Sequence, residues 1–264
     1  MWKLLLIPVF LYAASLAAMF AFQGRPLFPA SAVGGAGPLP PGAERLRLDT
    51  PDGNRLHGVH LPPSAAPSGT LIIGFGGNGW NAETAAAYLH EIFPQADVVA
   101  FHYRGYRPST GSPSARALLD DAPGVYDFAT ARFPRARRVA VGFSIGSGVA
   151  ASLAPRRPLD GLILVTPFDS LKAVAAGQLR WLPVRWLFRH EMAAAEWLRG
   201  SSVPTAIIAG GRDTLIAALR TDGLRRAAGR LVYDRTIAGA GHNDIYDRPD
   251  FRAAMREALA RVAG

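Results

Sequence analysis

Ser144 lies between two glycines in the motif G-x-S-x-G, which is formed by Gly142, Ser144 and Gly146. An apolar run precedes this motif and small residues follow it, which predicts a sharp turn from a strand into a helix. A serine on such a turn has strained backbone angles, and neighbours without side chains let the turn close. The N–H groups of the following helix would point to the place where an oxyanion forms. The motif therefore predicts a nucleophilic serine, against the alternative of a glycine-rich packing turn.

A base and an acid must accompany such a serine, because its hydroxyl is a weak nucleophile until a base takes its proton. Histidine is the usual base at neutral pH, and only His242 follows all the predicted strands. Asp213 comes directly after the strand predicted at 205–209, at the carboxyl end where such sheets assemble their sites. Asp169, after the preceding strand, is the alternative acid, although it could instead cap a helix. The chain order Ser144, Asp213, His242 predicts a catalytic triad.

A glycine-rich segment at 74–79 also matches the G-x-G-x-x-G pattern of dinucleotide-binding loops. The acidic residue that such loops need about 20 residues later is missing, because residues 101–104 read Phe-His-Tyr-Arg. Arg104 could accommodate an NADP phosphate, which leaves this alternative weakly open. The chain has no cysteine, which excludes a cysteine nucleophile, a disulfide and a cysteine-ligated metal. We expect neither an organic cofactor nor a metal.

Short apolar runs alternate with helical patterns from Glu44 to the end of the chain. Strands are predicted at 45–49, 55–61, 70–73, 98–103, 139–141, 162–165 and 205–209. Helices are predicted near 82–93, 114–132, 146–154, 215–228 and 250–262. Strands that alternate with helices imply right-handed crossovers and a mostly parallel sheet with helices on both faces. The predicted fold class is therefore α/β, doubly wound, in one domain of residues 44–264.

The segment 171–202 is longer than a connection between two neighbouring strands needs to be. It is rich in aromatic residues and contains a proline that interrupts any helix. We expect a short helical cap over the site, with an apolar wall for an acyl chain formed by Trp181, Trp186, Leu187 and Phe188. Ordinary packing of these large side chains onto the domain is the alternative.

Residues 4–22 are almost wholly apolar, and no charge occurs between Lys3 and Arg25. As a helix they would span about 28 Å, close to the ~30 Å of a bilayer core, so we expect residues 1–30 to form one transmembrane anchor. A cleaved signal peptide and a buried helix are the alternatives. Residues 31–43, rich in glycine and proline, predict a linker. Basic residues on the two sides nearly balance, so the side of the membrane is close to undetermined, with the extracytoplasmic side slightly favoured.

The chain carries a formal charge of +9, from 29 basic and 20 acidic residues. All but two of the basic residues are arginines, and no run of them alternates with aromatic residues that could stack on bases. A solvated, arginine-rich surface explains this balance of charge. We therefore expect no nucleic-acid partner.

Three motifs together, at 142–146, 211–213 and 239–242, resemble those of the α/β-hydrolase superfamily. The runs 103–114 and 23–29 are similar to small abhydrolase-domain serine hydrolases that carry an N-terminal membrane anchor. That group is related to hydrolases of the serine-aminopeptidase type. The resemblance covers essentially the whole chain.

This resemblance implies that the backbone N–H groups of Asn78 and Ile145 form the oxyanion hole. In such proteins the loop that contributes the first of these donors often reads His-Gly-Asn. Here Gly76, Gly77 and Asn78 take that place, so any bond that the histidine makes must be absent or replaced. The backbone donors themselves do not depend on it.

The sequence thus predicts a membrane-anchored serine hydrolase that cleaves small-molecule carboxylic esters or thioesters through an acyl-enzyme. A peptidase or aminopeptidase of the same fold is the alternative within this class, with Glu191 or Glu196 of the expected cap binding an amino terminus. An alternative from another class is a non-catalytic, anchored binding protein that keeps the fold.

Overall fold

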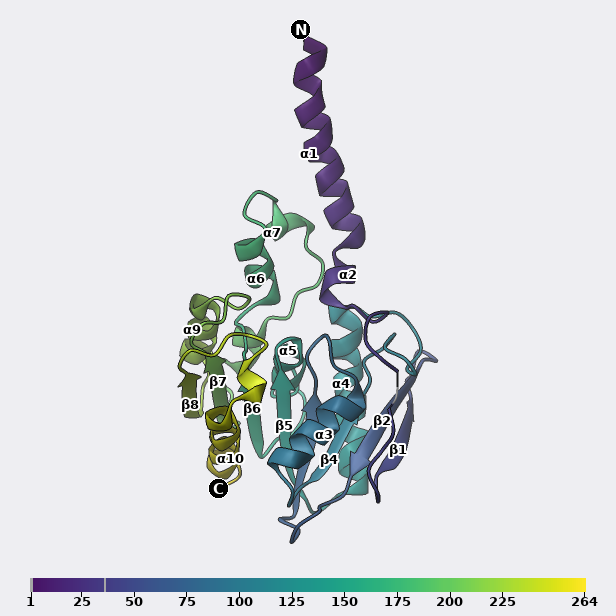
Figure 1. The fold of residues 1–264 in the computed structure, drawn as a ribbon, viewed down its shortest axis with the longest axis vertical. Helices are drawn as coiled ribbons and strands as arrows, with labels where there is room; N and C mark the ends of the chain where they lie inside the picture. Colours follow the sequence, from purple (N-terminus) through teal and green to yellow (C-terminus); the bar gives the residue numbers. More distant parts are fainter. Residues whose placement is uncertain (1, 36) are drawn as a thin grey trace.

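The computed structural model describes residues 2–35 and 37–264, with side chains from Ile7 onward. One eight-stranded sheet has the strand order β1-β2-β4-β3-β5-β6-β7-β8 (Figure 1). The strands are β1 (Glu44–Asp49), β2 (Arg55–Leu61), β3 (Thr70–Phe75), β4 (Asp97–Phe101), β5 (Arg137–Phe143), β6 (Gly161–Val165), β7 (Thr205–Gly210) and β8 (Leu231–Ile237). β2 is antiparallel to both β1 and β4, and every pairing from β4 to β8 is parallel. The predicted mostly parallel α/β sheet is therefore confirmed.

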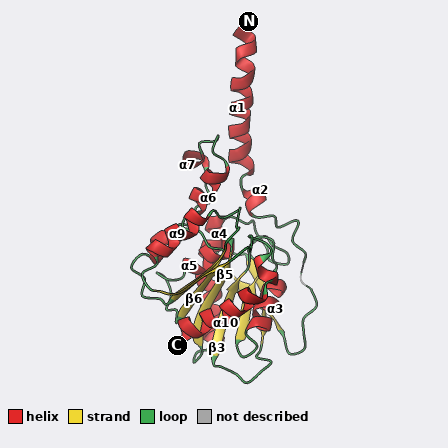
Figure 2. Ribbon diagram, turned by 60° about the vertical axis from the view of Figure 1, so that its left-hand side comes forward, coloured by secondary structure: helices red, strands yellow, loops and turns green. Residues whose placement is uncertain are grey.

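Helices cover both faces of the sheet (Figure 2). One face packs against α3 (Ala82–Ile92) and α10 (Pro249–Ala263), and the other against α4 (Ala115–Arg132), α5 (Ile145–Ala151) and α9 (Ala218–Ala227). The strands supply both cores, because successive side chains of a strand point to opposite faces. On β6, Leu162 and Leu164 join one buried cluster, whereas Ile163 and Val165 join the other.

The strand order reverses beside β3, and this reversal fixes where a site can form. β4 and β5 follow each other in the chain but lie on opposite sides of β3. Their connections therefore leave the crevice between β3 and β5 open at the carboxyl ends of these strands, which is where open α/β sheets bind ligands. The loop after β3 contains Asn78, and the turn after β5 contains Ser144.

Three short helices occupy the connection between β6 and β7, within the segment expected to form a cap. They are α6 (Leu171–Gln178), α7 (Val184–Leu187) and α8 (Ala194–Leu198). Ser170 caps α6, since its Oγ accepts a hydrogen bond from the N–H of Ala173 at 3.1 Å. In Figure 1 this connection rises above the carboxyl ends of the strands, and α7 at its top lies beside the lower part of α1.

The N-terminal segment forms α1 (Trp2–Phe22) and the short α2 (Gly24–Leu27), and α1 projects from the domain (Figure 1). Among the residues whose side chains the structure describes, 7–35 and 37–264, no helix is long and apolar enough to cross a membrane. The expected transmembrane helix is therefore not supported.

A buried histidine gives the fold an expected dependence on pH. The side chain of His102 is 1% exposed and its Nε2 lies 2.8 Å from Glu83 Oε2, although these atoms lack hydrogen-bond geometry. Burial lowers the pKa of His102, against the opposing charge of Glu83. Because the unfolded chain then binds the proton more tightly, the free energy of unfolding falls as the pH drops below about 6.5.

We expect the melting temperature of the wild-type chain to fall between about pH 7.5 and about pH 5.5. His102→Gln removes this titrating group, so its melting temperature should fall less over the same range. Thermal unfolding of both chains at the two pH values measures the difference. An equal decrease of the melting temperature in wild type and variant would show that His102 does not cause the pH dependence.

Candidate active site

Ser144 occupies a strained turn between β5 and α5. Its φ is 51° and its ψ is −116°, a left-handed conformation that costs a residue other than glycine about 1–3 kcal/mol. Close backbone approaches explain the two flanking glycines. A Cβ on Gly142 would lie 2.2 Å from the carbonyl oxygen of Gly146, and a Cβ on Gly146 would lie 2.2 Å from that of Phe75. The motif therefore folds as the tight strand-to-helix turn that its residue types predict.

His242 and Asp213 lie beside this serine. His242 Nε2 is 2.9 Å from Ser144 Oγ, and His242 Nδ1 is 2.7 Å from Asp213 Oδ2. The side chains of His242 and Asp213 are only 9% and 5% exposed, so little water competes for these bonds. When Nδ1–H donates a hydrogen bond to Asp213, Nε2 carries no proton and can accept the proton of Ser144.

The backbone after β7 holds the carboxylate of Asp213 in place. Its Oδ1 accepts hydrogen bonds from the N–H groups of Leu215 and Ile216, at 2.9 and 2.7 Å. Both oxygens of Asp213 are thus engaged, one by the backbone and the other by His242. The alternative acid, Asp169, lies elsewhere: its Oδ2 is 3.2 Å from Arg220 Nη1, and burial raises its pKa. The structure brings Asp213, and not Asp169, to the histidine.

The loop after β3 carries Asn78 beside the serine. Ile145 is the first residue of α5, so its N–H has no partner within that helix, and both Asn78 and Ile145 line the same cavity as Ser144. This loop has Gly76 at the position where His-Gly-Asn loops have a histidine, and two tyrosines from outside the loop hold its backbone. Tyr103 Oη donates to the carbonyl of Gly76 at 2.7 Å, and Tyr106 Oη donates to that of Asn78 at 3.0 Å.

Burial raises the pKa of both phenols, so Tyr103 and Tyr106 remain hydrogen-bond donors at neutral pH. The sequence motif at 103–114 contains both tyrosines but predicts no role for either. A role could have been inferred from the residue type, because the hydroxyl of a buried tyrosine usually needs a hydrogen-bond partner.

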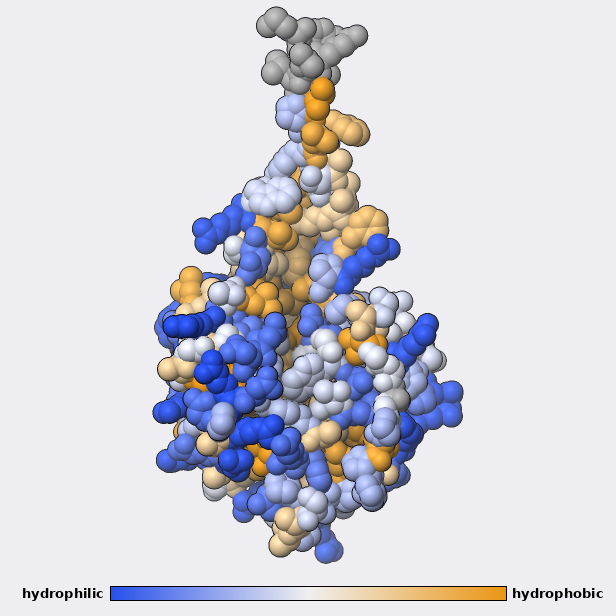
Figure 3. Space-filling view, in the orientation of Figure 1, coloured by the Kyte–Doolittle hydropathy of each residue, from blue (hydrophilic) through white to orange (hydrophobic). Residues whose placement is uncertain are grey.

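An apolar cavity of about 610 Å³ adjoins Ser144, which is within the range of small-molecule sites. Figure 3 shows a hollow lined by apolar residues between the base of α1 and the cap. Residues from the N-terminal segment, the oxyanion loop, the cap and the loop after β7 form its walls: Ala18, Met19, Phe22, Gln23, Pro26, Leu27, Asn78, Ile145, Phe168, Leu171, Val174, Ala175, Gln178, Leu179, Phe188, Leu215 and Ile216.

Of the four residues expected to form an acyl wall, only Phe188 lines this cavity. Trp181 and Trp186 are 61% and 87% exposed. Leu187 does not line the cavity, and its carbonyl accepts a hydrogen bond from the side chain of Gln23 at 3.0 Å. The two tryptophans therefore neither line the cavity nor pack the cap onto the domain.

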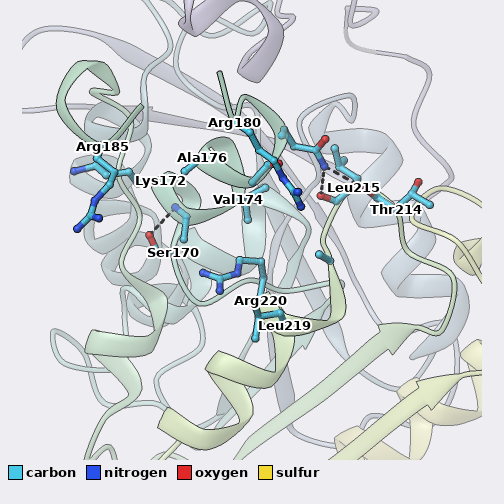
Figure 4. A pocket seen from close by; sticks show the side chains of 14 residues that line it. Ser170, Lys172, Val174, Ala176, Arg180, Arg185, Thr214, Leu215, Leu219 and Arg220 are labelled. Atoms are coloured by element: carbon cyan, nitrogen blue, oxygen red, sulfur yellow. Dashed lines mark hydrogen bonds between the residues drawn. The ribbon is translucent and has the colours of Figure 1, made fainter. Parts of the chain in front are cut away.

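A second cavity, of about 710 Å³, lies beside α6 and does not include Ser144. Four basic side chains line it (Figure 4): Lys172, Arg180, Arg185 and Arg220. Neither Glu191 nor Glu196 lines either cavity. Glu191 Oε1 instead accepts hydrogen bonds from Ser170 Oγ at 3.1 Å and from the N–H of Met192 at 2.7 Å, and Glu196 is exposed.

Comparison with known proteins assigns the family. A family model for the alpha/beta hydrolase fold matches residues 71–189. An uncharacterized protein of Mycobacterium tuberculosis is 33% identical over 242 residues, which cover 86% of this chain and 85% of that protein. The lysophosphatidylserine lipase ABHD12 of Xenopus tropicalis is 28% identical over 193 residues, which cover 62% of this chain and half of the lipase.

Solved structures share the fold at low sequence identity. An esterase of Pyrococcus furiosus has a TM-score of 0.68 and 18% identity, and the match covers 88% of this chain and 100% of the esterase. A lidless serine hydrolase of Xanthomonas campestris has a TM-score of 0.59 and 20% identity, covering 85% of this chain and 97% of that one. The chain belongs to the alpha/beta hydrolase family, as its sequence motifs predict.

Proposed function

We propose that this protein is a serine hydrolase that cleaves carboxylic esters or thioesters through an acyl-enzyme. The observation that carries the proposal is the chain of short contacts from Asp213 through His242 to Ser144 at the wall of an apolar cavity. The esterase and lipase names among similar proteins support a hydrolase in general. The ester specificity rests on the cavity.

In the proposed reaction, Ser144 Oγ attacks the carbonyl carbon of the substrate while His242 Nε2 takes the serine proton. Asp213 stabilises the imidazolium that results. The N–H groups of Asn78 and Ile145 bind the oxyanion of the tetrahedral intermediate. This intermediate collapses when His242 returns the proton to the departing alcohol or thiol, which leaves an acyl group on Ser144. Water then attacks the acyl-enzyme by the same steps and releases the acid.

The lining of the cavity favours an acyl ester over a peptide. An aminopeptidase would need a carboxylate near Ser144 to bind the charged amino terminus of its substrate. Glu191 and Glu196, the residues that could serve, are not among the cavity residues. The apolar side chains from the cap and the N-terminal segment suit the hydrocarbon part of an acyl group.

An oxygen ester, a thioester and an aminopeptidase substrate test this proposal. We expect purified full-length protein to hydrolyse the p-nitrophenyl ester and the thiocholine ester of butanoic acid with kcat/KM about 10²-fold or more above that for alanine p-nitroanilide, roughly 3 kcal/mol in the barrier. Continuous absorbance assays measure all three. A higher kcat/KM for the anilide would instead identify an aminopeptidase.

A further inference from the structure

The end of α1 and part of α2 lie against the site. Met19 and Leu27 contact the main buried cluster, and Phe28 is 4% exposed with its ring centroid 5.4 Å from that of His190. The side-chain amide of Asn78 donates to the carbonyl of Leu27 at 3.2 Å. The segment that was expected to lie in a membrane thus reaches the loop of the proposed oxyanion hole.

Gln23 joins this segment to the cap. Its side chain is almost fully buried, with 6% of the residue exposed. Its Nε2 donates to the carbonyl of Leu187 at 3.0 Å, and its Oε1 accepts from the N–H of Arg189 at 2.7 Å. Arg189 reinforces the contact, because its Nη2 donates to the carbonyl of Phe20 at 3.0 Å and its guanidinium lies 4.4 Å from the centroid of that ring.

The apolar cavity lies between the two parts that Gln23 joins. The N-terminal segment contributes Ala18, Met19, Phe22, Gln23, Pro26 and Leu27 to its lining. The side-chain amide nitrogens of the wall already donate to backbone carbonyls, as do those of Gln23 and Asn78. That of Gln178 donates to the carbonyls of Thr214 and Leu215 at 3.2 and 3.0 Å. A ligand in this cavity therefore meets a surface that offers apolar contact and few free hydrogen-bonding groups.

We propose that residues 18–27 form one wall of an acyl-binding site, and that Gln23 is a positioning residue that fixes this wall against the cap. The substrate class is then an ester or thioester of a long acyl chain, which extends from Ser144 along the base of α1. This inference rests on the proposed hydrolase function and specifies its substrate. It also makes the N-terminal helix part of the substrate site.

Filling the cavity from the N-terminal side tests the wall. We expect wild-type kcat/KM to rise along the p-nitrophenyl esters from acetate to dodecanoate, by up to about fourfold for each methylene that enters the cavity. Met19→Trp should lower the ratio of dodecanoate to butanoate kcat/KM by about tenfold or more, because the indole takes the space of several methylenes. Leu11→Trp places the same ring on the exposed part of α1 and should leave the ratio as in wild type. A wild-type ratio in Met19→Trp would overturn the proposal.

Gln23→Leu tests the positioning role, because it keeps the volume of the side chain and removes both hydrogen bonds to the cap. We expect KM for the dodecanoate ester to rise several-fold more than KM for the acetate ester, with kcat for acetate changing least. A merely structural role would lower the melting temperature and change KM for both esters alike, and that pattern would refute the assignment of Gln23.

A binding measurement separates this inference from the proposed reaction. Ser144→Ala should bind cis-parinaric acid, a fluorescent long-chain fatty acid, and Met19→Trp in the same background should weaken that binding by about tenfold or more. If wild type hydrolyses no ester but this difference is found, the proposed reaction fails and the acyl wall stands. Equal binding by the two variants would overturn the acyl wall, whatever the activity.

Discussion

Ser144→Ala and His242→Ala are each expected to lower kcat for p-nitrophenyl butanoate by about 10⁴–10⁶-fold, with the fold retained. The loss is large because the two residues act as a unit: without Oγ no acyl-enzyme forms, and without Nε2 the hydroxyl keeps its proton. The double variant should lose little more than either single variant. Steady-state kinetics, with circular dichroism to verify folding, measure these effects.

Asp213→Asn and Asp169→Asn form a matched pair for the acid of the triad. Asp213→Asn should lower kcat by about 10⁴-fold, since the amide no longer holds His242 in the tautomer that accepts the serine proton. Asp169 is bound by Arg220 and the N–H of Ser170, so Asp169→Asn should keep most of the activity. Full activity in Asp213→Asn together with loss in Asp169→Asn would assign the acid to Asp169.

Gly146→Ala is expected to lower the stability of the protein strongly, although it adds only one methyl group. The new Cβ would lie 2.2 Å from the carbonyl oxygen of Phe75 and 2.5 Å from that of Gly76. Both are backbone atoms at the end of β3 and cannot rotate away as a side chain could. Overpacking of this kind costs about 3 kcal/mol or more, which lowers the melting temperature of a chain of this size by about 6 °C or more.

Gly177→Ala is the matched control. It adds the same methyl group within α6, where a Cβ would meet no atom within 4 Å. Alanine is the better helix former by about 0.5–1 kcal/mol, so this variant should be as stable as wild type or slightly more so. Calorimetry of both variants measures the difference. A melting temperature for Gly146→Ala equal to that of Gly177→Ala would contradict the tight contact between the turn and β3.

Much of the fold could be predicted from the sequence, because the buried parallel strands are short apolar runs that are bounded by turn-forming residues. β8 was missed for the opposite reason. It is an edge strand whose Asp234, Arg235 and Thr236 are exposed, so it lacks the apolar run that marks the inner strands. Missing it did not change the predicted acid or base, since His242 follows both β7 and β8.

The candidate triad could be located from the sequence because each member belongs to a local motif at the end of a strand. The residues that form the walls of the cavity could not be located in this way. Met19 and Gln23 meet residues that are more than 120 positions away in the chain, and no periodicity relates the two segments. The apolar character of residues 4–22 indicated a membrane span, although the same character at 18–22 also serves to line a cavity.

The aromatic residues of the cap that line the cavity could not be identified from the sequence either. Aromatic residues are usually buried, which favoured Trp181 and Trp186 as pocket residues. Trp186 lies in α7 and Trp181 in the turn before it, at the tip of the connection (Figure 1), and both side chains are largely exposed. Phe188, only two positions after Trp186, turns inward and is 8% exposed. Composition thus indicated the segment but could not distinguish the inward side chains from the outward ones.

The most direct test of the central claim is covalent labelling of the full-length protein with a fluorophosphonate, which reacts only with an activated serine. Intact-mass and peptide-mass measurements should find one probe per chain, attached to Ser144, and no labelling in His242→Ala, where the base that activates the hydroxyl is missing. An unlabelled wild-type chain, or a probe attached to a different residue, would contradict the assignment of Ser144 as the nucleophile of a serine hydrolase.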